Sequence, residues 1–136
     1  MKRFFILLIV SVLSLNCSMV KSSKTDEKDI SKKWTLVQMQ NKKLPISETI
    51  ILNIQQSEGR FSGNSGCNQI GGEIRIIDKN ISLSDIYSTQ MLCNPKIMQF
   101  EQEYTLLLEK VASFEVSEKT LTLFDKNKNE ILYFEL

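Results

Sequence analysis

Histidine is absent from this 136-residue sequence. Its absence removes the side chain that most often serves as a general base or as a transition-metal ligand. A large excess of one charge is also absent, because the 17 basic side chains include Lys2 and Arg3 and the remaining 15 face 16 acidic ones. Without a clustered positive field there is no electrostatic basis for nucleic-acid binding. An enzyme of this composition would depend on carboxylates, lysine, tyrosine or cysteine.

A hydrophobic run long enough to span a bilayer is missing too. The longest one, Phe4 to Leu15, has about twelve residues, and a transmembrane helix needs roughly 20. Met1-Lys2-Arg3 before it supplies the positive start of a secretory signal peptide. Cys17 follows directly after Leu13-Ser14-Leu15-Asn16, which resembles a bacterial lipoprotein signal with Cys17 as the lipidated first residue of the mature chain.

Three cysteines in an exported chain leave one unpaired, and lipidation of Cys17 would remove the odd one. The alternative is ordinary cleavage near Cys17, which would leave a secreted protein with a free thiol. With Cys17 as the first residue of the mature chain, residues 1–16 are the lipoprotein signal peptide. Residues 17–33 are polar and charged, so we expect a flexible tether. The folded domain should occupy residues 34–136.

Short strands in hairpin order dominate that domain. Trp34 and Leu36 should share the inner face of the first strand, with Val37 and Met39 near the other face. Residues 84–93 read as a loop or irregular strand. The expected strands are Trp34–Met39, Ile50–Gln56, Arg60–Gly63, Glu73–Ile77, Ile81–Leu83, Phe114–Val116, Thr120–Phe124 and Ile131–Leu136.

One helix interrupts the strands. Asn94 is a natural N-cap and Pro95 fits the first helical turn. The apolar stripe of this helix is predicted to face the core, and its acidic residues, Glu101 among them, to form a solvated face. The stripe consists of Ile97, Phe100, Tyr104, Leu107, Leu108 and Val111. We therefore predict an α+β domain: a curled antiparallel sheet or partial barrel of about seven to eight strands, packed on one helix.

Two cysteine segments are expected to form one site, in which a sheet loop meets the start of the helix. They are Gly66-Cys67-Asn68, followed by the pair Gly71-Gly72, and Thr89-Gln90-Met91-Leu92-Cys93. The glycines suggest positive φ, a bulge or a close backbone approach. A phosphate-binding loop is excluded because the segment lacks a Gly-Lys-Ser/Thr ending and runs into a strand.

Together with the helix and the last strands, these two segments resemble the META/HslJ domain over roughly residues 34–136. The resemblance implies a bacterial envelope protein, often a lipoprotein, with a curled antiparallel sheet and one helix. HslJ is linked to the heat-shock response and to novobiocin resistance, and no reaction is established for the family. Gln90 stands where many members have Arg, so an anion contact is not carried over. The candidate binding residues are Asn68, Thr89, Gln90 and Met91.

In an oxidising envelope, Cys67 and Cys93 should form a disulfide. It would close a loop of roughly 26 residues, which the chain-entropy model values at about 3.5 kcal/mol. A redox pair is disfavoured because Cys-x-x-Cys spacing is absent. A metal site is disfavoured because two thiolates without histidine make a poor closed site. We expect no cofactor, no metal and no catalytic residue.

Three hypotheses for function follow. The first is a monomeric, non-enzymatic lipoprotein, anchored through Cys17 to the outer membrane and facing the periplasm. It would act as a binding or chaperone-like module in stress or antibiotic tolerance, with an unknown envelope partner. The second is a secretin-pilot-like lipoprotein or a carrier of a small apolar ligand, with a cleft lined by Phe100, Tyr104 and Leu107. The third is a hydrolase using Ser65 or the Ser84-Asp85 loop, which lacks an evident base.

Overall fold

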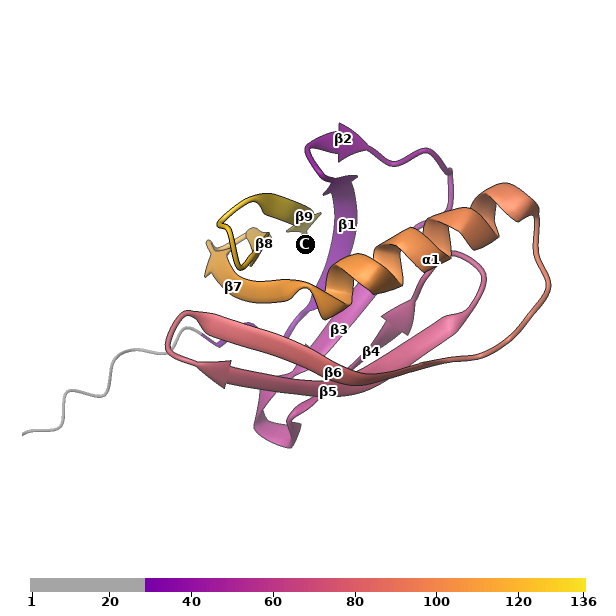
Figure 1. Cartoon of the computed structure of the whole chain (residues 1–136). Coiled ribbons are helices and arrows are strands. Elements are labelled where there is room, and N and C mark those ends of the chain that lie inside the picture. The colour runs from indigo at the N-terminus through magenta and orange to yellow at the C-terminus, as the bar shows by residue number, and fades with distance from the viewer. Residues whose placement is uncertain (1–28) are drawn as a thin grey trace, which may run out of the picture.

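Residues 29–136 are described by a computed structural model, and Figure 1 shows their arrangement. The predicted signal peptide, most of the predicted tether and Cys17 therefore lie outside the described residues. The elements, in chain order, are β1 (Lys33–Met39), β2 (Lys42–Lys43), β3 (Ile51–Gln55), the 3-10 turn η1 (Gln56–Glu58), β4 (Arg60–Asn64), β5 (Gln69–Ile77), β6 (Asn80–Ser88), α1 (Pro95–Glu109), β7 (Val111–Val116), β8 (Thr120–Asp125) and β9 (Glu130–Glu135).

The strands form a closed antiparallel barrel. Their order is β2-β1-β3-β4-β5-β6-β7-β8-β9, and β1 also pairs with β9, so eight strands make the ring and the two-residue β2 is attached to β1. The predicted α+β class and single helix are confirmed. The sequence predicted a curled sheet or partial barrel. In the structure the barrel is closed, because β9 pairs with β1.

The ring has one weak seam, between β6 and β7. These strands pair only at Asn80↔Ser113, with one further backbone bond from Phe114 N to Lys79 O. Helix α1 follows β6 in the chain and precedes β7, and it lies across the barrel in Figure 1. The helix thus lies in the connection between the two strands whose pairing is shortest.

The helix begins as the sequence predicts. Asn94 is the N-cap, and its side-chain oxygen accepts a hydrogen bond from Lys96 N at 2.8 Å, with Pro95 in the first turn. The stripe residues Phe100, Tyr104 and Leu108 are buried in one core cluster with the inward side chains of the barrel. Burial of these side chains, rather than intrinsic helix propensity, supplies most of the stability of the helix.

Several details differ from the sequence prediction. The domain begins before Trp34, because Ile30 is buried and its carbonyl accepts the Trp34 indole N–H at 3.0 Å. A register shift between Leu36 and Gln38 reverses the alternation in β1, so Met39 is buried with Leu36 instead of facing the other side. Residues 84–88, expected to be irregular, complete β6.

The glycine pair Gly71-Gly72 serves close packing. A Cβ on Gly72 would lie 2.6 Å from Ser84 O and 2.7 Å from the Phe61 ring, both too close for a real contact. A register shift in the β5–β6 pairing falls between Gly71 and Glu73. The expected bulge and close backbone approach are therefore present at this pair, and Phe61 is buried against it.

Tyr104 provides a test of core packing. Its side chain is 0% exposed, its hydroxyl has no hydrogen-bond partner among the described residues, and burial raises its pKa well above the ordinary value. Tyr104→Phe removes no protein hydrogen bond, so we expect stability to be unchanged or raised by about 1 kcal/mol in urea unfolding. Tyr104→Ala, the matched cavity variant, should cost about 3–5 kcal/mol. A loss above about 1 kcal/mol in Tyr104→Phe would contradict this packing.

Candidate functional site

The turn between β4 and β5 carries the centre of the site. Ser65 N donates to Asn68 O at 2.9 Å, which closes residues 65–68 into a tight turn. Gly66 has φ of 121°, a backbone conformation that side chains with a Cβ disfavour. With Gly66 in this conformation, the two N–H groups that follow it can point in one direction.

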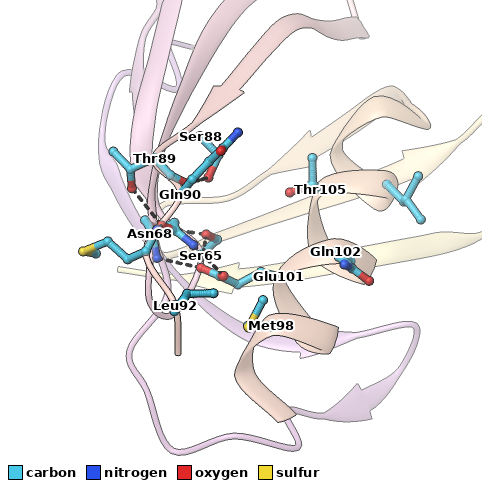
Figure 2. A pocket seen from close by; sticks show the side chains of 12 residues that line it. Ser65, Asn68, Ser88, Thr89, Gln90, Leu92, Met98, Glu101, Gln102 and Thr105 are labelled. Carbon is cyan, nitrogen blue, oxygen red and sulfur yellow. Dashed lines mark hydrogen bonds between the residues drawn. The ribbon is translucent and has the colours of Figure 1, made fainter. Parts of the chain in front are cut away.

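Those N–H groups bind the carboxylate of Glu101 from the second turn of α1. Glu101 Oε1 accepts bonds from Cys67 N at 3.0 Å and Asn68 N at 2.6 Å. The Ser65 hydroxyl lies 2.7 Å from the same oxygen, and Asn68 Nδ2 donates to Oε2 at 2.8 Å. The turn and the helix are therefore joined by four hydrogen bonds to one charged group, and Figure 2 shows Ser65, Asn68 and Glu101 of this network.

Glu101 was predicted to face solvent, and that prediction is wrong. Its side chain is only 9% exposed. Burial alone would raise the pKa of Glu101, but the hydrogen bonds from Ser65, Asn68 and Cys67 together lower it below its ordinary value. The ionised carboxylate is thus the form that the turn binds.

Asn68 extends the network to the segment before the helix. While its Nδ2 donates to Glu101, its Oδ1 accepts bonds from Thr89 Oγ1 at 2.9 Å and Met91 N at 2.8 Å. The backbone of Gln69 adds two further bonds, from Gln69 N to Thr89 Oγ1 and from Thr89 N to Gln69 O. One asparagine therefore links the turn, the helix and the segment that precedes it.

A disulfide completes the connection. Cys67 and Cys93 are bonded, with their Cα atoms 6.4 Å apart and 26 positions apart in sequence. Cys93 directly precedes the N-cap Asn94, so the bond ties the turn to the start of α1. The expected crosslink is present in the structure, and the turn is held to the helix at two points.

A groove of about 660 Å³ lies beside this network. It runs between the end of β6 and one face of α1, as Figure 2 shows, and we call it the α1–β6 groove. Its lining residues are Ser65, Asn68, Ser88, Thr89, Gln90, Met91, Leu92, Met98, Glu101, Gln102, Thr105 and Leu106.

All four candidate binding residues, Asn68, Thr89, Gln90 and Met91, line this groove. That they bind a ligand stays a prediction. Asn68 is mainly occupied by its hydrogen bonds within the protein, whereas Gln90 and Met91 are exposed. Sequence reasoning missed Glu101, although residues 97, 101, 104 and 108 are spaced 4, 3 and 4 and so fall on the apolar stripe. A lone acid on that stripe was the available signal.

The apolar rim was also missed. Leu92 is 92% exposed, and Met91 and Leu106 are more than half exposed, on opposite sides of the groove. By contrast, the cleft expected over Phe100, Tyr104 and Leu107 is not formed, because all three side chains are buried in the core. The exposed apolar surface lies on a different face of the helix.

A serine hydrolase is poorly supported by this geometry. Ser65 is only 1% exposed, and its hydroxyl lies in the turn, close to both Glu101 Oε1 and Asn68 O. A carboxylate with a lowered pKa is a weak base for a serine hydroxyl. Ser84 and Asp85 line other hollows on the barrel, away from Ser65.

Among residues 29–136, no group of three or more Cys, Asp or Glu side chains lies close enough to hold a metal ion. In the same part of the chain, no helix combines the length and the apolar character required to cross a membrane.

The fold and site define a closed antiparallel barrel with one inserted helix, stapled through a glycine-cysteine-asparagine turn. The family model of the META domain matches residues 28–136, so the chain belongs to the META domain family. The predicted family is confirmed.

Solved structures share this fold at low identity. A protein from Burkholderia xenovorans, solved by NMR, has a TM-score of 0.63 and 24% identity over 77% of this chain and 81% of its own. A DUF4847 family protein from Bacteroides vulgatus has a TM-score of 0.55 and 13% identity, covering 77% and 92% of the two chains. No curated protein matches the chain. These likenesses show the fold alone.

Glu101→Gln tests the network. Gln keeps one acceptor oxygen but loses the charge and places an amide N–H₂ against Asn68 Nδ2. We expect a loss of about 2–3 kcal/mol in chemical denaturation, because bonds to charged groups are worth about 1.5–3 kcal/mol. Glu103→Gln, an exposed acid on the same helix, is the control and should stay within about 0.5 kcal/mol. Equal, small effects of both would show that the network is not stabilising.

The lowered pKa of Glu101 also predicts a pH dependence. Its contribution to stability is present above the ordinary value of 4.5 and is lost as pH falls through the lower folded pKa. Unfolding free energies of wild type and Glu101→Gln should therefore converge as pH falls from 6 toward 3. A constant difference across that range would contradict the assignment of an ionised Glu101.

Proposed function

We propose that this protein is a non-enzymatic, lipid-anchored envelope protein whose META domain binds a partner in the α1–β6 groove. The observation that supports this proposal is the contrast between the internally hydrogen-bonded charge and the exposed apolar side chains of that groove. Among the described residues that line it, only Glu101 is charged, and its carboxylate accepts four hydrogen bonds within the protein, while Met91, Leu92 and Leu106 are exposed at the rim. Exposed apolar surface around a concave site is typical of binding surfaces.

The absence of an activated nucleophile or a poised acid–base pair at the groove favours binding over catalysis. The Ser65 hydroxyl is buried in the turn, and the Glu101 carboxylate, whose pKa is lowered, accepts four hydrogen bonds within the protein. The lining of the groove is otherwise amide, hydroxyl and apolar. Such groups can recognise a partner but provide little means of activating one.

The anchor rests on the sequence. The short signal-like run and Cys17 support lipidation, and the Cys67–Cys93 bond fits an oxidising compartment. Residues 18–28 would then separate the domain from the membrane. We place the protein in a bacterial cell envelope, on the outer membrane facing the periplasm, with a role in stress or antibiotic tolerance suggested by the family resemblance.

A small apolar ligand is the second candidate occupant. The groove volume of about 660 Å³ falls within the range of about 300–1,000 Å³ common for small-molecule sites. Such a ligand would make the protein a carrier. The open rim, with Leu92 almost fully exposed, favours a larger partner that covers this side chain.

The anchor predicts a specific modification. In the native host, intact mass spectrometry should show a triacyl-sized addition on Cys17, and the protein should fractionate with membranes. Cys17→Ser should lose both the addition and the membrane association, because stable anchoring needs more than one acyl chain. An unmodified Cys17 in soluble protein would overturn the lipid anchor.

The groove predicts where a partner contacts the domain. A photo-crosslinking amino acid in place of Leu92 should give defined adducts in intact cells, since Leu92 stands at the rim. The same substitution at Ile77, another exposed apolar residue that lies outside the α1–β6 groove, is the control. Identical crosslinking from both positions, or none from Leu92, would argue against a binding groove.

A further inference from the structure

We propose that the α1–β6 groove accepts an extended segment of another polypeptide, which adds as a strand to the open edge of β6. This proposal rests on the proposed binding function and specifies the chemistry of the partner. The partner is an uncharged segment in which apolar side chains alternate with small polar ones. Its backbone would pair with β6 and its apolar side chains would cover the rim of the groove.

The open edge follows from the strand pairing. On one side, β6 pairs with β5 from Asn80 through Ser88. On the other side, within the described residues, its only strand pair is Asn80↔Ser113. From Ile81 to Ser88 the second edge of β6 therefore has no strand partner, and the end of this edge at Ser88 lines the groove.

The direction of the Ser88 backbone can be deduced from its neighbours. Thr89 N donates to Gln69 O at 3.0 Å, so Gln69 and Thr89 point these groups toward each other. Hydrogen-bonded and non-hydrogen-bonded pairs alternate along an antiparallel ladder. The adjacent pair, Ile70↔Ser88, is then the non-hydrogen-bonded type, and the Ser88 N–H and C=O point away from β5, toward the groove.

The composition of this edge leaves it available. Natural proteins protect open edges with lysine, proline, bulges or inward charges. Residues 82–88 read Ser-Leu-Ser-Asp-Ile-Tyr-Ser and contain neither lysine nor proline. The backbone of β6 is irregular at Asp85, which has φ of 50° and lines another hollow. This irregularity lies before the end of β6 that borders the groove. That end is unprotected.

The side chains around the edge define what the segment must carry. Met91 and Leu92 on one side and Leu106 on the other offer apolar contacts, while Gln102 and Thr105 offer neutral hydrogen-bonding groups. Within residues 29–136, no lysine, arginine or aspartate lines the groove. Strand addition obtains affinity from main-chain bonds and specificity from alternate side chains, which matches a free edge beside an apolar rim.

Heptapeptides provide the test. A set of acetylated, amidated peptides, with Val, Ile, Leu or Phe alternating with Thr, is titrated into the ¹⁵N-labelled domain with its disulfide intact. At least one member should shift the amide resonances of residues 88–92 and 102–106 and slow hydrogen exchange at Ser88. The same peptide N-methylated on alternate amides, so that one backbone edge cannot donate, should bind at least about tenfold more weakly in one of the two methylation frames.

Two variants of the domain test separately the contribution of the β6 backbone edge and that of the apolar rim of the groove. Ser88→Pro removes the outward N–H at a position where an edge strand tolerates proline, and should weaken binding about tenfold. Leu92→Ser should weaken it about threefold or more, while Leu136→Ser, an exposed apolar residue at the chain end, should not. Unchanged affinity in Ser88→Pro, with the fold intact by NMR, would contradict strand addition.

The outcomes also separate this inference from the proposed function. If no peptide of the set perturbs the groove at millimolar concentration, strand addition is overturned, even when Leu92 crosslinks to a folded partner in cells. If peptides bind equally well with and without N-methylation in both frames, the groove is an apolar contact surface only, and strand addition is again overturned. If Leu92 gives no crosslink in cells but the peptides bind through the Ser88 edge, strand addition is supported, and the proposal that the groove binds a partner in cells is overturned.

Discussion

The carboxylate of Glu101 is the interaction on which the site depends. A charge with little exposure must be matched by donors, and the 65–68 turn supplies them through two backbone N–H groups, a hydroxyl and an amide. Gly66 permits the turn and Asn68 extends it to the segment that precedes α1. The cysteine bond adds a covalent tie at the start of the same helix.

The groove follows from this arrangement. The 65–68 turn is tied to α1 at the second turn of the helix, through Glu101, and just before its N-cap, through Cys93. The helix therefore lies beside the end of β6 without a strand between them. The weak β6–β7 seam leaves the edge of β6 open there, and Asn68 positions Thr89 and Met91 along one wall. Asn68 and Thr89, which look like part of a binding motif in sequence, therefore form the frame of the groove, while Met91, Leu92 and Leu106 are exposed at its rim.

Much of the fold was predictable from local patterns. The N-cap Asn94, the β5–β6 hairpin and the pairing of Cys67 with Cys93 depend on signals within a few residues or on cysteine count. Barrel closure, the bulge in β1 and the exposed edge of β6 depend on long-range pairing that no local pattern encodes. For Glu101, the sequence shows its position on the apolar stripe of the helix. Its burial was not predictable, because its four donors come from a turn more than thirty residues earlier.

A double-mutant cycle measures the central interaction most directly. Unfolding free energies are compared for wild type, Glu101→Gln, Asn68→Ala and the double variant, all with the disulfide intact. If the two side chains act as one unit, the double variant should lose at least about 1 kcal/mol less than the sum of the single losses, as expected for residues in contact. Additive losses would contradict the account, because they would mean that Glu101 and Asn68 stabilise the domain independently.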